Sequence, residues 1–208
     1  MHRASIADED VTEVHGLLVT SPARTIADLA RAGISRECVV ALDYTLSSRA
    51  PQGLRLVKEE LIELVVRQGG WGRRRAVELI EFGDGRSGSP GETGSRLIFA
   101  EGGFESPELQ HHYPRHGRRG YDSDFWWKRS LRGRPLAGEF DGAGKYLRKE
   151  YLRNKTPGEA VVAEKRREDY MRRCDGSDFM RWGFPEVMRP PLLRALAIQH
   201  GVPRIRRN

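Results

Sequence analysis

Hydrophobic positions in the first third of the chain recur at the spacing of amphipathic helices. The pair Ser21-Pro22 supplies a capping residue and a proline for a first helical turn, and Gly33 and Gly69 are typical helix stops. We therefore expect helices over residues 23–32, 35–46, 54–68 and 73–82. The pattern therefore predicts a small helical module. This module contains no arrangement of residues typical of a catalytic site.

The glycine- and serine-rich stretch GDGRSGS, residues 83–89, is the clearest boundary in the chain. Such a composition is typical of a connection because it favours turns over helix or strand. We therefore divide the chain into a helical module over residues 1–83 and a second domain over residues 84–208.

The second domain alternates between helix and strand signals. Capping-box spacings at residues 89–92 and 156–159 predict two helix starts. Strands are expected over residues 109–113, 121–127, 136–141 and 177–182, and a last helix over 192–199. This order predicts an α+β fold, with helices packed against a sheet.

Two of these strands bring carboxylates together. Residues 121–127 and 136–141 are joined by a turn that contains glycine and proline, which predicts a hairpin. Because side chains alternate faces along a strand, Glu139 and Asp141 should share one face, and Asp124 should come alongside them. Three carboxylates that close repel one another unless a cation neutralises them. The pattern therefore predicts a site for a hard divalent cation.

Composition and charge narrow the classes of protein that fit. The chain of 208 residues has a net charge of +7, which favours a polyanionic partner. No apolar run reaches membrane-spanning length, and the first residues lack the apolar core of a signal peptide. We therefore expect a cytoplasmic protein with no membrane partner. Cys38 and Cys174 lie far apart, which indicates reduced thiols rather than a zinc site or a disulfide framework.

Several short motifs in the second domain resemble a known family. They are E-T-x-S-R from residue 92, D-F-W from 124, E-F-D-G-x-x-K-Y from 139, E-K-x-R-E-D from 164 and R-W from 181. In these motifs the chain resembles the actinobacterial AbiEi-family type IV antitoxins. Their C-terminal half resembles the very-short-patch-repair endonuclease-like branch of the PD-(D/E)XK nuclease superfamily. The resemblance covers about residues 86–190 and implies a restriction-endonuclease-like mixed sheet flanked by helices.

Residues 19–33 also resemble the middle region of those antitoxins. Members of the group usually carry a winged-helix DNA-binding module upstream, and this chain starts after that module would have ended. The resemblance therefore implies either a truncated form of a longer protein or a chain that works without its operator-reading part.

The resemblance also implies roles for individual residues. Asp124 takes the place of the aspartate of the PD motif, and Glu139 that of the carboxylate that follows it. Asp141 stands where the superfamily has its lysine, so the simple motif is not intact. Lys145 occupies a position that is histidine in the very-short-patch-repair-like branch, and Glu92 matches an acidic residue that many members point at the metal. The implied catalytic residues are Asp124, Glu139, Asp141 and Lys145, and the implied ligands of Mg²⁺, or of Mn²⁺, are Asp124, Glu139, Asp141 and Glu92.

Each of these residues also has a structural interpretation. Asp141 precedes a glycine, as in many turns, and the capping box alone explains Glu92. Lys145 fits a solvated strand end. An arginine could neutralise Asp124 or Glu139 inside the protein, and such an ion pair would remove the basis of the catalytic interpretation.

Basic and aromatic residues around the predicted hairpin supply candidate contacts to nucleic acid. Trp126 shares a face with Asp124, and its ring could stack on a base. Arg167 interrupts an otherwise core-facing stripe of its helix, so it needs a carboxylate or phosphate partner. Lys165 is a second candidate for the catalytic lysine. Basic residues on both sides of the predicted strands should form a positive rim around the carboxylates. The candidate nucleic-acid-binding residues are therefore Arg118, Arg119, Trp126, Lys128, Arg132, Arg134, Lys165 and Arg167.

Two functions from different classes fit these patterns. The first is a magnesium-dependent endonuclease that cleaves phosphodiester bonds in DNA. The second is a non-catalytic antitoxin or transcriptional regulator of a type IV toxin–antitoxin system, which would bind DNA or a nucleotidyltransferase-type toxin. The sequence favours the endonuclease, because the acidic trio is visible in the residues, whereas the antitoxin interpretation rests on the family. The sequence leaves the oligomeric state of the protein open.

Overall fold

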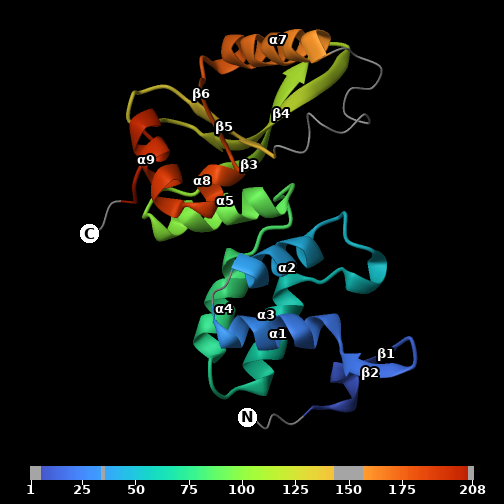
Figure 1. The fold of residues 1–208 in the computed structure, drawn as a ribbon. Coiled ribbons are helices and arrows are strands. Elements are labelled where there is room, and N and C mark those ends of the chain that lie inside the picture. The colour runs from blue at the N-terminus through green and yellow to red at the C-terminus, as the bar shows by residue number, and fades with distance from the viewer. Residues whose placement is uncertain (1–5, 34–35, 143–156, 206–208) are drawn as a thin grey trace. The chain divides into compact units, whose positions relative to one another are not determined.

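The chain folds into two compact units, Met1–Arg86 and Ser87–Asn208. A computed structural model describes residues 6–33, 36–142 and 157–205. Figure 1 shows the arrangement of elements within each unit. No helix in these described ranges is long and apolar enough to cross a membrane.

In its described residues, the first unit packs four α-helices together and carries a β-hairpin ahead of them (Figure 1). Apolar side chains at helical spacing form its core, among them Ile26, Leu42, Leu61 and Ile80. Its described elements are η1 (Asp8–Asp10), β1 (Val11–Val14), β2 (Leu17–Thr20), α1 (Pro22–Ala32), α2 (Arg36–Leu46), η2 (Gln52–Leu54), α3 (Lys58–Gln68) and α4 (Arg73–Phe82).

The predicted helix over residues 54–68 is wrong at its start. Residues 52–54 form a short 3-10 turn, and α3 begins only at Lys58. Leu54 and Val57, apolar positions of the predicted helix, are 42% and 47% exposed. The reason is a backbone hydrogen bond of 2.9 Å from the Leu56 N–H to the Thr45 carbonyl, which belongs to an extended connection rather than a helical turn.

The second unit is an α+β fold, as the sequence predicts. Its four-stranded sheet, counted over the described residues, has the order β3-β4-β5-β6. The first three strands are antiparallel and β5 pairs in parallel with β6, so the sheet is mixed. The elements are α5 (Pro90–Glu101), β3 (Glu108–Arg115), β4 (Arg118–Trp127), β5 (Leu136–Asp141), α7 (Pro157–Asp175), β6 (Asp178–Gly183), α8 (Phe184–Met188) and α9 (Pro190–His200).

Helices cover both faces of this sheet: α7 lies over one face, and α5, α8 and α9 lie over the other (Figure 1). The apolar core is on the second of these faces. Phe99 of α5 makes edge-to-face contacts with Phe125, Trp127 and Trp182 at ring distances of 5.5–5.9 Å. Phe140 belongs to the same core and lies so close to Gly91 that an added Cβ there would fall 2.1 Å from its ring. These contacts fix the sheet against α5.

Candidate functional site: carboxylates and arginines beneath α7

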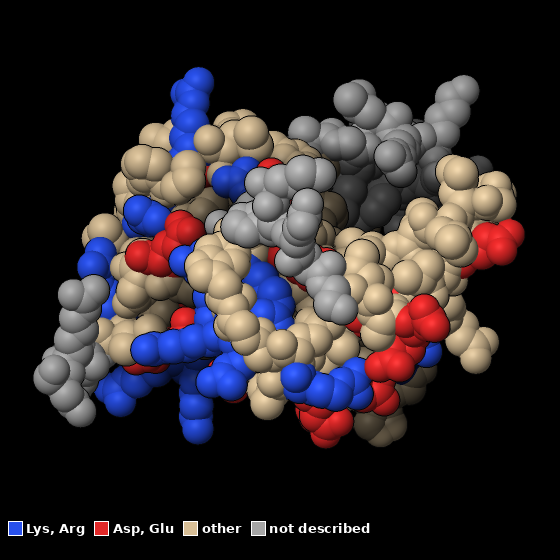
Figure 2. Space-filling model, turned by 90° about the horizontal axis from the view of Figure 1, so that it is seen from below, with Lys and Arg blue, Asp and Glu red and all other residues tan. Residues whose placement is uncertain are grey.

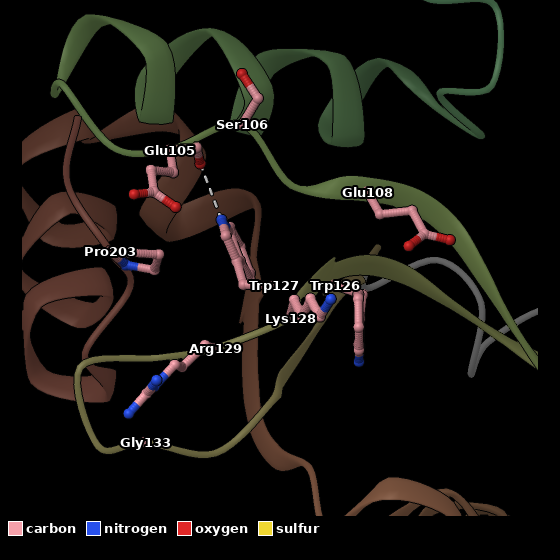
Figure 3. Close-up of a pocket in the computed structure, with 9 residues that line it drawn as sticks. All are labelled: Glu105, Ser106, Glu108, Trp126, Trp127, Lys128, Arg129, Gly133 and Pro203. Atoms are coloured by element: carbon pink, nitrogen blue, oxygen red, sulfur yellow. Dashed lines mark hydrogen bonds between the residues drawn. The ribbon is translucent and has the colours of Figure 1, made fainter. Parts of the chain in front are cut away.

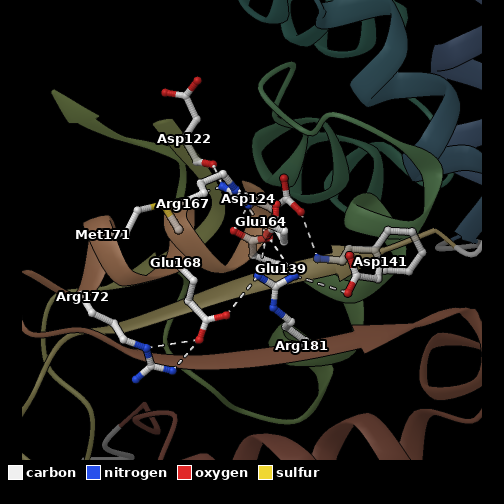
Figure 4. A network of polar contacts seen from close by, with 11 residues as sticks. Asp122, Asp124, Glu139, Asp141, Glu164, Arg167, Glu168, Met171, Arg172 and Arg181 are labelled. Atoms are coloured by element: carbon white, nitrogen blue, oxygen red, sulfur yellow. Dashed lines mark hydrogen bonds and ion pairs between the residues drawn. The ribbon is translucent and has the colours of Figure 1, made fainter. Parts of the chain in front are cut away.

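The predicted hairpin places the carboxylates as the alternation of side chains requires. β4 and β5 are antiparallel, with Phe125 opposite Gly138, so Asp124 lies beside Glu139. Asp124 accepts a hydrogen bond of 2.9 Å from the Phe140 N–H through Oδ2. The expected sharing of one face by Glu139 and Asp141 is confirmed, because both carboxylates contact one guanidinium on the face covered by α7 (Figure 4).

Glu139 is buried and bound by arginine. It is 5% exposed, and its Oε1 accepts a hydrogen bond from the Arg167 guanidinium of α7. Arg181 of β6 approaches its Oε2 at 3.6 Å. Burial raises the pKa of the Glu139 carboxyl, and the two arginines act in the opposite direction. This is the internal ion pair that the sequence leaves open as the structural alternative for Glu139.

Arg181 ties several carboxylates together. Besides Glu139, it lies 3.6 Å from Asp141, 2.7 Å from Glu164 and 3.4 Å from Glu168 (Figure 4). Because β6 pairs in parallel with β5, Arg181 stands directly opposite Glu139. The surrounding carboxylates raise the pKa of its guanidinium against the effect of burial. Arg181 therefore links the central strands to α7.

Arg167 has the carboxylate partners that its position in the helix predicts. Besides the contact with Glu139, its Nε donates to Glu164 at 3.2 Å, and Nη1 donates to the carbonyl of Asp122 at 3.0 Å. Glu164 in turn contacts Arg181. Although burial works against its ionisation, hydrogen bonds and charge from Arg181 and Arg167 lower the pKa of Glu164. The two arginines and the carboxylates around them form one network, which we call the arginine–carboxylate cluster.

Sequence reasoning did not single out Arg181, although a signal for it was present. A charged residue interrupts a strand whose alternate positions, Met180 and Trp182, are buried. Such a side chain on the opposite face of a covered sheet needs an ionic partner. The sequence could not identify that partner, because the parallel pairing of β5 with β6 brings together Glu139 and Arg181, which are 42 residues apart.

Glu92 has a structural role at the start of α5. It completes the capping box of α5, where Ser89 accepts from the Glu92 N–H at 3.3 Å. Its carboxylate accepts hydrogen bonds from the Gly88 N–H, the Ser89 hydroxyl and the Gln110 side chain at 2.6, 2.9 and 3.0 Å. The capping interpretation therefore explains the buried position of Glu92.

The candidates for the catalytic lysine are Lys145 and Lys165. Lys145 lies outside the described residues. Lys165 is exposed on α7, next to Glu164 of the arginine–carboxylate cluster. Its role stays a prediction.

The described residues do not fit a magnesium centre in this arrangement. Mg²⁺ requires oxygen ligands in near-octahedral geometry. Within residues 6–33, 36–142 and 157–205, no group of three or more His, Cys, Asp or Glu side chains is placed to hold a metal ion. The carboxylate of Glu139 has guanidinium groups on both oxygens. Asp124, Glu139, Asp141 and Glu92 are thus not placed together as metal ligands in this arrangement, and their metal-binding roles stay predictions.

The basic residues of the expected rim fall into two groups along β4. Arg118 and Arg119 are exposed at the turn between β3 and β4. The second group lies in the connection that follows β4, at the other end of this ten-residue strand. Its members Lys128, Arg132 and Arg134 are exposed, and the Arg132 side chain donates to the carbonyl of Gln199 at 2.7 Å. The two groups therefore lie at opposite ends of β4, and their role in a positive rim around the carboxylates stays a prediction.

A groove of about 640 Å³ opens beside Trp126 in the second unit (Figure 3). Lys128 and Arg129 line it together with Trp126, and Glu105 and Glu108 also contribute to its wall. The Trp126 ring stacks on His111 at a centroid distance of 4.1 Å, and its N–H donates to Asp175 at 3.0 Å. These contacts fix the indole ring at the groove.

Comparison with known proteins gives a partial match to two relatives. Both are described as uncharacterized proteins of Mycobacterium tuberculosis, Rv2248 of strain H37Rv and MT2308 of strain CDC 1551. Each is 37% identical over 119 residues, which are 55% of this chain and 41% of the relative. The chain thus spans about two fifths of the length of the curated relatives that it matches. No family model and no solved structure matches the chain.

Proposed function

We propose that the second unit binds nucleic acid and that its arginine–carboxylate cluster is a structural element rather than a metal centre. The observation that carries this proposal is the groove in which Trp126 lies beside Lys128 and Arg129. The two cationic side chains are suited to contact the phosphates of a duplex, and the Trp126 ring forms the groove wall beside them.

The distribution of charge supports the proposal. The second unit has 24 Lys and Arg against 16 Asp and Glu, a net charge of +8, whereas the first has 12 against 13, a net charge of −1. The whole excess of positive charge therefore belongs to the unit that contains the groove. A polyanion gains affinity from such an excess through the release of its counterions.

The state of Glu139 supports the non-catalytic part of the proposal. A metal-binding carboxylate needs lone pairs directed at the ion, whereas both oxygens of Glu139 face guanidinium groups. Arg167 and Arg181 also connect α7 to β5 and β6. A structural role accounts for the burial of these charges without any further ligand.

Charge reversal in the groove tests the proposal. We expect the double variant Lys128→Glu/Arg129→Glu to bind a fluorescently labelled 20-base-pair duplex about tenfold more weakly in EDTA and to show a shallower dependence on salt. The matched control is Arg166→Glu/Arg173→Glu, which makes the same charge change on exposed residues of α7 outside the groove. Equal losses in the two variants would show that the groove is not the binding surface.

A magnesium-dependent endonuclease is the second candidate. The observation that favours it is the side-by-side position of Asp124 and Glu139 on paired strands, with Asp141 on the same face. If the carboxylates bind Mg²⁺, 10 mM Mg²⁺ should stabilise the wild type against urea but not the variant Glu139→Gln. The antitoxin interpretation, with a nucleotidyltransferase-type toxin as partner, keeps the sequence resemblance as its support.

A further inference from the structure

A second surface with the composition of a nucleic-acid site lies in the first unit, at the connection between α3 and α4. It consists of the segment GGWGRRR, residues 69–75, and it surrounds a pocket of about 760 Å³ lined by residues 70–75 and Glu78. Figure 2 shows one face of the molecule, on which Lys and Arg side chains gather.

Arg31 of α1 holds the connection in one conformation. Its guanidinium donates to the carbonyls of Val65, Gly69 and Trp71 at 3.0, 2.7 and 3.0 Å. Gly72 has φ of +74°, and a Cβ added there would lie 2.8 Å from the Arg31 carbonyl oxygen. A residue with a side chain is therefore disfavoured at this position for two reasons. The segment is a built part of the fold, not a loose loop.

This conformation leaves a large aromatic ring in solvent. Trp71 is 66% exposed, although burial of its ring would be favourable. The Arg75 guanidinium lies 5.7 Å from the centre of its ring. An exposed indole next to a cation is suited to stack on a base while the cation contacts a neighbouring phosphate.

Three successive arginines follow the tryptophan, and all three are exposed. Arg74 pairs with Glu78 at 2.8 Å, with side chains that are 92% and 58% exposed, so solvent screens the pair strongly. Cations in the first turn of a helix oppose its dipole, and the first turn of α4 has no acidic residue. Helix stability therefore does not explain these arginines, whereas the binding of a polyanion does.

We propose that Trp71 and Arg73–Arg75 form a binding site for single-stranded nucleic acid, in which a base stacks on Trp71 and the arginines contact the backbone. A single strand fits better than a duplex, because only unpaired bases can present a face to the exposed ring. The proposal concerns the first unit alone, and it holds whether or not the groove of the second unit binds a duplex.

The test compares full-length variants by fluorescence anisotropy with labelled dT20 and, separately, with a labelled 20-base-pair duplex. We expect Trp71→Ala to weaken dT20 binding by roughly 5- to 100-fold, the effect of losing one base–aromatic stack. Arg73→Glu/Arg75→Glu should weaken it further and lower its salt dependence. The matched control is Tyr44→Ala, which removes an aromatic ring, 46% exposed, from α2 of the same unit.

Three results would overturn the proposal. One is that Trp71→Ala and Arg73→Glu/Arg75→Glu both bind dT20 within twofold of the wild type, as the control Tyr44→Ala is expected to do. Another is an equal loss in Trp71→Ala and Tyr44→Ala, which would indicate a general effect. The third is binding of the wild type to vesicles of anionic phospholipid, lost in Arg73→Glu/Arg75→Glu, without any binding of dT20. Failure of the groove variants to affect duplex binding would concern the second unit only.

Discussion

Arginines have opposite surroundings in the two units. Arg167 of α7 and Arg181 of β6 in the second unit have carboxylates as partners, and the Arg167 side chain is 20% exposed. Arg73 and Arg75 of the first unit lie in solvent beside an exposed tryptophan. The comparison teaches that the partners of an arginine decide its role, not how many arginines the chain has. A guanidinium with carboxylate partners can hold the fold together, whereas an exposed one is available to a ligand.

The largest effect on stability should come from breaking the arginine–carboxylate cluster. Arg167→Met removes the hydrogen-bonded cation from buried Glu139, and we expect a loss of about 3 kcal/mol in the free energy of unfolding, measured in urea. This figure is at the lower end of the range for buried pairs, because Arg167 is partly exposed. The control Arg172→Met disrupts the more exposed pair with Glu168 and should cost less than about 1 kcal/mol. If Arg167→Met and Arg172→Met lose the same unfolding free energy, the buried and the exposed ion pair do not differ in their contribution to stability.

A smaller effect is expected from the connection that carries Trp71. Gly72→Ala combines a left-handed backbone with a close approach to Arg31, and we expect it to cost about 1–3 kcal/mol of unfolding free energy. Gly70 has φ of +75° but open space around it, so Gly70→Ala should cost less. If urea titrations rank the two glycines the other way, Arg31 does not constrain the segment as inferred.

The dependence of stability on pH should sharpen the picture of the arginine–carboxylate cluster. The pKa of Glu164 is lowered in the folded protein. Its contribution to stability is therefore present above its ordinary pKa of 4.5 and is lost as the pH falls through the lower folded value. Between pH 5.5 and pH 3, Glu164→Gln should lose less unfolding free energy than the wild type. A variant that loses as much as the wild type would show that the arginines do not hold this carboxylate.

The smallest effect on stability is expected at the exposed arginines. Arg74→Ala removes a surface pair with Glu78 and should change the unfolding free energy by no more than about 0.5 kcal/mol. If the first unit binds single strands, the same variant should bind dT20 more weakly than the wild type. A stability change above 1 kcal/mol would place Arg74 with the structural arginines.

Local patterns predicted most of the fold. The strand over residues 136–141 and the helix over residues 73–82 have the bounds that alternation and helical spacing predict. The β1–β2 hairpin was not expected, because Leu17 and Leu18 are 68% and 78% exposed and show no buried face. Patterns of burial cannot reveal an element that buries nothing.

Sequence patterns predicted individual residues of the candidate site, but not the long-range contacts between them. The neighbouring strands identified the carboxylates Asp124 and Glu139, and the helical stripe identified Arg167 as a residue that needs a partner. That Arg167 and Arg181 meet the same carboxylate depends on the packing of α7 and on a parallel strand pairing. Both are long-range features, so a sequence with 36 Lys and Arg residues does not indicate which of them reach Glu139.

Incubation of supercoiled plasmid with 10 mM Mg²⁺ or Mn²⁺ tests the central claim most directly. If the arginines occupy Glu139 as part of the fold, the wild type should nick the plasmid no faster than Glu139→Ala or Asp124→Ala, although it binds the DNA in EDTA. Metal-dependent nicking by the wild type that is lost in both variants would contradict this account and establish the carboxylates as a catalytic metal site.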